Sequence, residues 1–201
     1  MRSKNAIQTA SPNGIFRKEV FQNTKSVYII AFIGMALFLM IPVQLPFLLK
    51  ENSEISNTNV GLLMSLWILC SAVTSLFYKY IRRKMSFYPV FSLAFLLWSF
   101  GYTGLALSEN LLIITIGLIL SGVGNGLVLP NTKVLLINIV PGEFRGRSVG
   151  VLTMAFYFGQ FFSPMLFRAA IPEGEIQYGF GFYAGVMIVV SFIYFIIRNR
   201  K

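Results

Sequence analysis

Three glycines, Gly122, Gly124 and Gly126, alternate in the stretch S-G-V-G-N-G-L-V-L-P-N-T-K, which ends at Lys133. Glycine-rich loops followed by a lysine bind phosphate when they join a strand to the N-terminus of a helix. This stretch lies inside one long apolar run instead, with no soluble strand before it. Gly122 and Gly126 are four positions apart, and small residues at that spacing let two membrane helices pack closely. The sequence therefore favours helix packing over phosphate binding.

The same apolar run contains two further residues that bear on function. Pro130 removes one backbone hydrogen bond, which predicts a kink and leaves a hinge role open beside the packing role of the glycines. Lys133 has two interpretations. Its long stem can carry the ammonium group to the cytoplasmic interface, or the residue can line an aqueous cavity, because charged side chains within spans usually face water or mark function.

Uncharged polar side chains also occur at helix depth. An unpaired amide is costly in lipid, so each is expected to hydrogen-bond another helix, the commoner outcome, or to face an aqueous cavity. Tyr157 and Gln160 are three positions apart and can share one helix face, which makes them the stronger candidates for substrate contact. The candidates for the substrate path are Gln44, Asn125, Asn131, Lys133, Tyr157 and Gln160.

The residue inventory excludes most catalytic chemistry. The chain has no histidine and no aspartate, its seven acids are all glutamates outside the apolar runs, and Cys70 is the single cysteine. No nucleophile–base pair, metal cluster or acid pair can be assembled from such segments. We therefore expect no enzymatic activity, no metal and no cofactor. We also expect that this chain alone does not run a proton-driven cycle, since no suitable group is present to load and release the proton.

The composition indicates that the chain folds in a lipid bilayer. Of 201 residues, 56% are hydrophobic and only 12% are charged, against about 25% charged in soluble domains. Six apolar segments are long enough to cross a bilayer, which takes about 20 residues. A span must satisfy its own backbone hydrogen bonds in lipid, so each is predicted to be a helix. The predicted spans are residues 27–49, 60–77, 87–107, 111–140, 149–171 and 182–197.

Positive charge is distributed unevenly between the two ends of these spans. Fourteen of the 17 Lys and Arg residues lie in the N-terminal stretch, the second and fourth connections and the C-terminal tail, whereas Lys50 and Arg168 alone lie on the other side. The positive-inside rule then places both termini in the cytoplasm of a cell-membrane protein. The net charge of +10 is thus a topology signal, and we do not expect nucleic acid as a partner.

Four motifs occur in order along the spans. The first motif, P-V-Q-L-P-F, contains Pro42 and Pro46, and the second, G-V-G-N-G-L-V-L-P-N, covers residues 122–131. The third, R-G-R, covers residues 145–147, and the fourth, G-Q-F-F-S-P, contains Pro164. Together they resemble the C-terminal six-helix half of a major facilitator superfamily transporter, in its bacterial drug- and sugar-efflux branch. The resemblance implies an all-α integral membrane fold, half of a twelve-helix protein. It also implies transport of a small organic solute by alternating access.

Two departures from the family pattern stand out. The connection Y-K-Y-I-R-R-K-M, with Arg82, Arg83 and Lys84, resembles the family's basic loop motif without its glycine and aspartate. In addition, this chain contains one six-helix half, whereas transporters of the family have two such halves that face each other. The partner is then an N-terminal six-helix half or a second copy of this chain, unless the protein is a non-transporting scaffold. The cytoplasmic loop motifs are assigned to Arg82, Arg83, Lys84, Arg145, Gly146 and Arg147.

The resemblance divides the chain into three parts. Residues 1–26 resemble the central cytoplasmic linker of such a transporter and contain either a short helix on the membrane surface or a partly ordered tail. Residues 27–197 form the transmembrane domain, in contact with membrane lipid. Residues 198–201 are a basic cytoplasmic tail. Within the domain, a packing or gating role is expected for Pro42, Pro46, Gly122, Gly126, Pro130 and Pro164.

Overall fold

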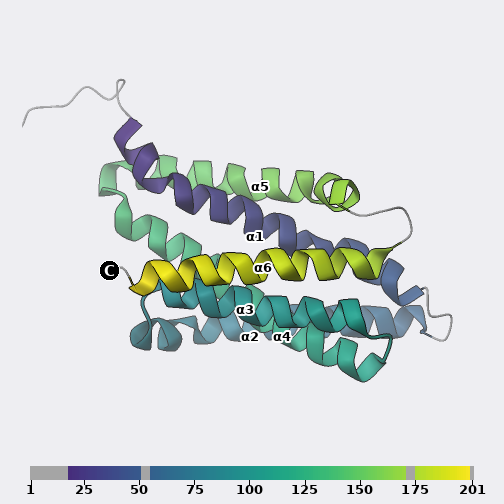
Figure 1. Ribbon diagram of the computed structural model, residues 1–201. Helices are drawn as coiled ribbons and strands as arrows, with labels where there is room; N and C mark the ends of the chain where they lie inside the picture. Colours follow the sequence, from purple (N-terminus) through teal and green to yellow (C-terminus); the bar gives the residue numbers. More distant parts are fainter. Residues whose placement is uncertain (1–17, 51–54, 171–174, 200–201) are drawn as a thin grey trace, which may run out of the picture.

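The computed structural model describes residues 18–50, 55–170 and 175–199, and within them the chain forms six long helices and one short 3₁₀ turn, without strands (Figure 1). All six helices are long and apolar enough to cross a membrane, so the predicted all-α fold with six spans is confirmed. Their bounds are α1 Lys18–Lys50, α2 Asn57–Lys84, α3 Phe87–Leu107, α4 Leu111–Ile139, η1 Gly142–Phe144, α5 Arg145–Ala170 and α6 Ile176–Asn199.

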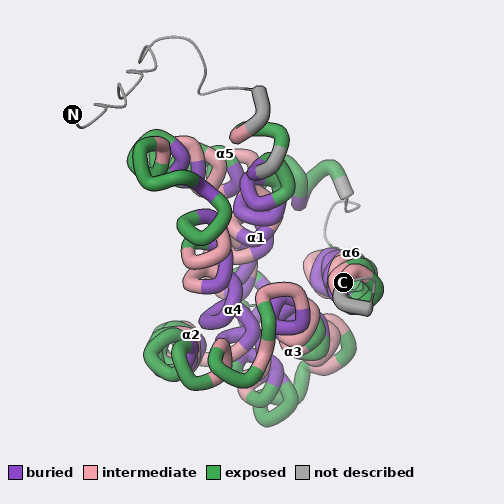
Figure 2. The backbone as a smooth tube through the Cα atoms, turned by 90° about the vertical axis from the view of Figure 1, so that its left-hand side faces the viewer, coloured by how far each residue is buried: buried purple, intermediate pink, exposed green. Residues whose placement is uncertain are grey.

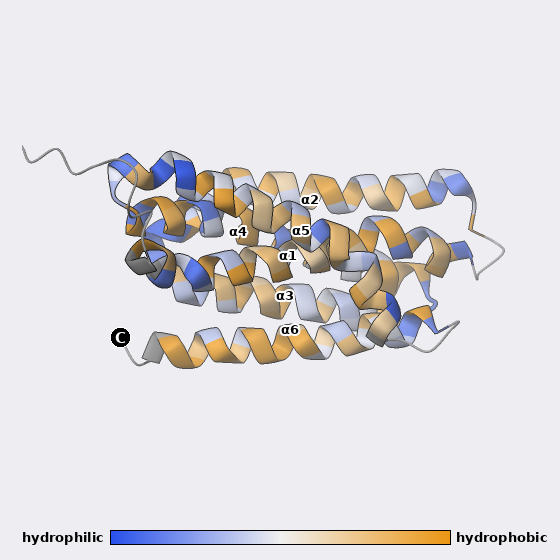
Figure 3. Cartoon of the chain, turned by 90° about the horizontal axis from the view of Figure 1, so that it is seen from above, coloured by the Kyte–Doolittle hydropathy of each residue, from blue (hydrophilic) through white to orange (hydrophobic). Residues whose placement is uncertain are grey.

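Helices α1, α2, α5 and α6 continue beyond the apolar runs that identified them, whereas α3 matches its predicted span and α4 ends one residue earlier. Hydrophobic residues run along the helices and hydrophilic residues gather towards the two ends of the bundle (Figure 3). Lys and Arg are good helix formers that remain solvated outside the lipid. The basic motifs were therefore wrongly assigned to loops. Arg82, Arg83 and Lys84 form the last turn of α2, and Arg145, Gly146 and Arg147 form the first turn of α5.

The N-terminal boundary differs as well. Helix α1 begins at Lys18, so residues 18–26 continue the first span in one helix and form no separate surface helix. The predictions for residues 1–17 and for residues 200–201 of the tail lie outside the described part of the chain. Elsewhere, side-chain caps define the helix starts. The Ser56 hydroxyl accepts a hydrogen bond from the backbone N–H of Asn59, and the Asn110 side chain accepts one from that of Leu112.

Helix α4 occupies the centre of the bundle. It contacts α1, α2, α3 and α5, whereas α3 packs between α4 and α6, and α5 packs mainly on α1. Seen end-on, α1 and α4 form a central column with α5 at one end and α2 and α3 at the other (Figure 2). Among the described residues, α2 and α5 make no contact with each other. One side of α4 is therefore bordered by two helices that do not meet.

Glycines on α4 set these close approaches. A Cβ atom added at Gly122 would lie 2.6 Å from the carbonyl oxygen of Trp67, and one at Gly126 would collide with the backbone of α2. Gly124 faces another way, where a Cβ would lie 2.9 Å from the backbone nitrogen of Trp98 on α3. The alternating glycines thus serve two neighbours, α2 through Gly122 and Gly126 and α3 through Gly124.

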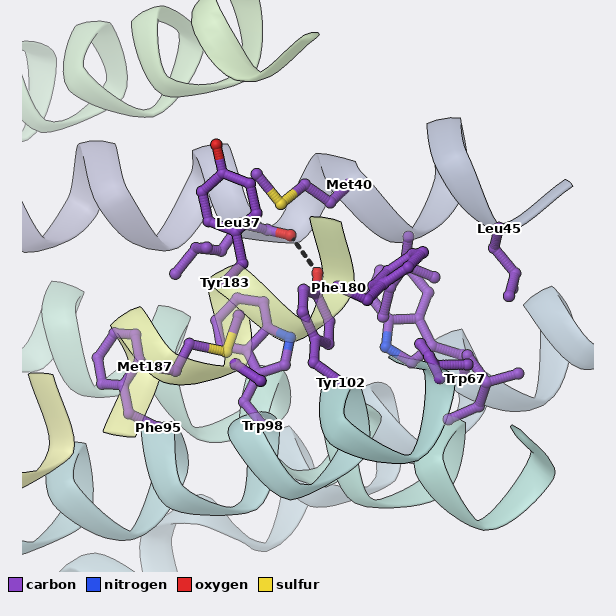
Figure 4. Close-up of a cluster of buried hydrophobic side chains, with 14 of the residues drawn as sticks. Leu37, Met40, Leu45, Trp67, Phe95, Trp98, Tyr102, Phe180, Tyr183 and Met187 are labelled. Atoms are coloured by element: carbon purple, nitrogen blue, oxygen red, sulfur yellow. Dashed lines mark hydrogen bonds between the residues drawn. The ribbon is translucent and has the colours of Figure 1, made fainter. Parts of the chain in front are cut away.

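Hydroxyl groups fix helix α1 from two sides. The Tyr102 hydroxyl of α3 donates to the carbonyl oxygen of Leu37 at 2.6 Å, within a cluster of buried aromatic side chains (Figure 4). The Ser163 hydroxyl of α5 donates to the carbonyl oxygen of Ala36, also at 2.6 Å. Both donors are buried, and bonds of this type between membrane helices contribute on the order of 1 kcal/mol each.

The glycine packing predicts opposite effects of alanine at two positions. Gly126→Ala pushes α2 away from α4 and should destabilise the protein by about 1–3 kcal/mol, as overpacking does. Gly185→Ala on α6 meets no atom within 4 Å and should be neutral or stabilising by up to about 1 kcal/mol, since alanine is the better helix former. Thermal unfolding of both variants in mild detergent measures the difference. Equal melting temperatures would contradict this account of the contact.

Candidate functional site

The exposed surfaces of the helices differ in character. Helix α5 is the least apolar of the six spans and shares with α2 the smallest buried fraction, whereas α6 is similarly exposed and among the most apolar. A surface in contact with lipid tails must be apolar, and polar groups within spans usually face protein or water. Large hydrophobic side chains are nevertheless exposed on both helices, so the lower hydropathy of α5 describes the helix as a whole.

The outer face of α5 carries an aromatic and methionine patch. Met154, Tyr157, Phe158 and Phe161, spaced three or four apart as neighbours on a helix face are, line a shallow pocket of about 380 Å³. Tyr157 and Phe161 are 67% and 72% exposed, so the largest side chains of the patch are free to contact a solute. We refer to these four residues as the α5 patch. Gln160 is half-buried on the same helix.

The two asparagines of α4 belong to helix packing, which corrects their place among the candidates for the substrate path. The Asn125 amide is buried and donates to the Ser71 hydroxyl of α2 at 2.8 Å. Asn131 is fully buried, accepts a hydrogen bond from the Tyr78 hydroxyl at 2.9 Å and donates to the carbonyl of Phe87 at 3.0 Å. A side chain buried and bonded in this way between helices has no surface left for a solute.

Lys133 lies elsewhere on α4 and is exposed. Its neighbour Asn131 contacts α2 and the start of α3, whereas Leu136 packs in a cluster with α1 and α5. Because α3 and α1 cover their own sides of α4, the exposed position at Lys133 opens between α2 and α5, the two helices that do not meet. The structure therefore places Lys133 at the gap between α2 and α5.

The remaining candidates are spread along three helices. Gln44, Pro42 and Pro46 are half-buried within α1, which continues through both prolines. Pro130 is half-buried within α4, and Pro164 is exposed on α5. The structure thus leaves Tyr157 and Lys133 exposed and Gln160 half-buried. It buries Asn125 and Asn131 between helices.

The basic motifs lie at the turns between α2 and α3 and between α4 and α5. The Arg82 guanidinium lies 3.7 Å from the centre of the Phe87 ring and donates to the carbonyl of Met85 at 2.8 Å, which fixes the turn between α2 and α3. Arg145 donates to the carbonyl of Val140 at 3.4 Å. The other members are exposed: Arg83, Lys84, Gly146 and Arg147.

A second pocket, of about 630 Å³, lies where α3 ends and α6 begins. Its lining includes Glu109, Glu175 and Tyr178. The sequence did not indicate this pocket, because its two carboxylates come from connections 66 positions apart. The residues of the α5 patch other than Tyr157 were also missed, although the spacing of M-A-F-Y-F-G-Q-F already places Met154, Phe158 and Phe161 on one helix face.

Comparison with known proteins agrees with this arrangement. The family model of the Major Facilitator Superfamily matches residues 27–201. The chain belongs to the major facilitator superfamily. A related protein, Multidrug resistance protein 3 of Bacillus subtilis (strain 168), is 32% identical over 119 residues, which cover 59% of this chain and 22% of that protein. The matched region thus accounts for well under two thirds of the relative's length.

Membership in the superfamily, together with the six spans, makes the chain a multi-pass membrane protein of a transporter family. Proteins of this superfamily generally are not enzymes. The superfamily resemblance drawn from the four motifs is therefore confirmed. Within the fold, α4 is the central helix, Lys133 lies on it at the gap between α2 and α5, and the α5 patch is exposed on α5.

The hydrogen bonds of Asn131 predict a defined cost when its partner is removed. Tyr78→Phe deletes the hydroxyl that donates to the Asn131 side chain and should lower stability by about 1–3 kcal/mol, the cost of an unsatisfied buried polar group. Tyr80→Phe is the matched control, since Tyr80 is 60% exposed on the same helix. Detergent melting curves of both variants test this. If Tyr80→Phe lowered stability as much as Tyr78→Phe, the role assigned to the Tyr78–Asn131 hydrogen bond would be contradicted.

Proposed function

We propose that this chain is the C-terminal six-helix half of an efflux-type secondary transporter, and that it moves a small organic solute across the membrane by alternating access. The observation that carries the proposal is the exposed aromatic and methionine patch on α5, the least apolar of the six spans as a whole. Tyr157 and Phe161 contact the solute, and Gln160 supplies a hydrogen bond beside them. The related Bacillus protein, named for multidrug resistance, supports an efflux function.

The partner binds the side of the bundle between α2 and α5. This side combines the two least buried helices, and a solute path there needs a second wall to exclude lipid. An N-terminal six-helix half is favoured as that wall, because the relative is far longer than this chain. A second copy of the chain inserted in the same direction is the competing partner, and closed two-fold symmetry would then apply to the pair.

The topology follows from the charges. The cytoplasmic ends of α2, α5 and α6 carry the basic residues, so the protein resides in the cell membrane with both termini in the cytoplasm. During the transport cycle α1 and α4 bend at Pro42, Pro46 and Pro130, where the backbone lacks hydrogen bonds. Gly122 and Gly126 keep α2 in contact with α4 while this occurs.

Accessibility of single cysteines tests the proposed path. In a Cys70→Ala background, Tyr157→Cys on α5 should react with a membrane-impermeant thiol reagent in intact membranes, because its side chain borders water. Val189→Cys on α6 is the matched control, since Val189 is 59% exposed. It lies about 15 Å from the C-terminal end of α6, and Tyr157 lies about 18 Å from the N-terminal end of α5, so the two depths are similar. It should not react, because that face contacts lipid. Equal reaction of the two would overturn the path.

Flux in vesicles tests transport and the partner together. The chain is purified in mild detergent with whatever polypeptide accompanies it, reconstituted, and assayed for uptake of a fluorescent aromatic dye. We expect flux that falls at least tenfold in Phe161→Ala, together with a second six-helix polypeptide in the preparation. A defined dimer of this chain that moves dye would replace the heteromeric partner. A stable preparation without flux would indicate a scaffold and refute the transport proposal.

A further inference from the structure

Lys133 is the one charged residue at depth on the side of α4 that opens between α2 and α5. It is exposed there, while Asn131 and Leu136 on either side of it are fully buried against neighbouring helices. It lies six residues from the end of α4 at Ile139, which corresponds to about 9 Å along the helix axis. Its ammonium group can then extend by the length of its stem either towards the cytoplasm or further into the bundle.

The α5 patch lies at a matching depth. Met154 is nine residues and Tyr157 twelve residues from the start of α5 at Arg145, about 14 and 18 Å along the axis. A lysine stem directed inward brings the ammonium group to the level of Met154. Lys133 and the large exposed rings of the α5 patch thus lie at a similar depth along their helices.

Among the residues that the structure describes, no carboxylate lies at the depth of Lys133. The carboxylates whose side chains the structure describes are Glu109, Glu143 and Glu175, and each lies at a helix end or in a connection between helices. The mid-membrane parts of the described helices contain none. A solute cation would therefore meet a like charge without a compensating acid from this half, whereas a solute anion would find its counter-ion at Lys133.

From this arrangement we propose that the solute is an organic anion with an aromatic body, its acidic group paired with Lys133 and its ring packed on the α5 patch. The inference rests on the proposed function and names the substrate class of the same path. The low dielectric of a partly enclosed path strengthens such a pair relative to water. The aromatic rings bind the body of the solute through burial of apolar surface.

The electrostatic effect of Lys133 on the path can be measured without knowing the substrate. Tyr157→Cys in the Cys70→Ala background is treated, in membranes of expressing cells, with an anionic and a cationic methanethiosulfonate reagent of similar size. Lys133→Gln should lower the ratio of anionic to cationic reaction rates by about fivefold or more, as expected for loss of one charge within about 10 Å. Lys133→Arg should retain the ratio. The matched control is Lys79→Gln, an exposed lysine near the end of α2.

A pair of charge-matched ligands then tests the substrate class. 2-Naphthoate should slow labelling of Tyr157→Cys at concentrations at least tenfold below those needed for 2-naphthylmethylammonium. That preference should disappear in Lys133→Gln and persist in Lys79→Gln. Equal protection by the two ligands, or a preference that Lys133→Gln leaves unchanged, would overturn the inference.

The outcomes separate the two levels of the argument. If neither reagent reaches Tyr157→Cys, the aqueous path itself is absent and the proposed function fails with it. If both reagents react and Lys133→Gln leaves their ratio unchanged, the path stands and Lys133 extends to the cytoplasmic interface instead, which overturns the anion inference alone. A reduced ratio with protection by 2-naphthoate supports both.

Discussion

The close approach of α4 to its neighbours is the constraint on which this bundle depends. Lipid tails are as apolar as the side chains, so burial alone provides little drive for helices to associate, and close packing with a few hydrogen bonds has to provide it. Gly122, Gly124 and Gly126 allow that packing on two sides of one helix. Once α2 and α3 are held there, Asn125 reaches Ser71 and Asn131 reaches Tyr78. The polar contacts between these helices thus depend on the contacts made by glycine.

The same packing determines which surface is left open. With α3 and α1 against α4, and α6 covering α3, the helices with the least buried surface are α2 and α5, and they do not meet. Their exposed sides are therefore set by the position of the central helix. Helices α5 and α6 are exposed to a similar extent, although α5 as a whole is the less apolar of the two.

The spans could be predicted from the sequence, because hydropathy reports directly which segments prefer lipid. The bounds of α3 could also be predicted, but those of α2 and α5 could not, since helical hydrogen bonding continues into solvated residues such as Arg82 and Arg145. The orientation of polar side chains was also inaccessible. In a helix that is apolar on every side, Asn131 and Lys133 look equivalent, and only the fold shows that one meets Tyr78, 53 positions away, while the other is exposed.

The partnership of α3 and α6 has a consequence for biosynthesis. The Ser99 hydroxyl of α3 donates to the carbonyl of Ala184 on α6, 85 positions further along the chain. The side chain of Ser92 pairs with that of Ser191, 99 positions further along. At translation rates of about 5–20 residues per second, Ser99 leaves the ribosome roughly 4–17 s before Ala184. During that interval α3 has entered the bilayer without its last neighbour. Insertion of α6 therefore completes the fold, and a ribosome that stalls before residue 176 leaves an aromatic helix face open to chaperones and proteases.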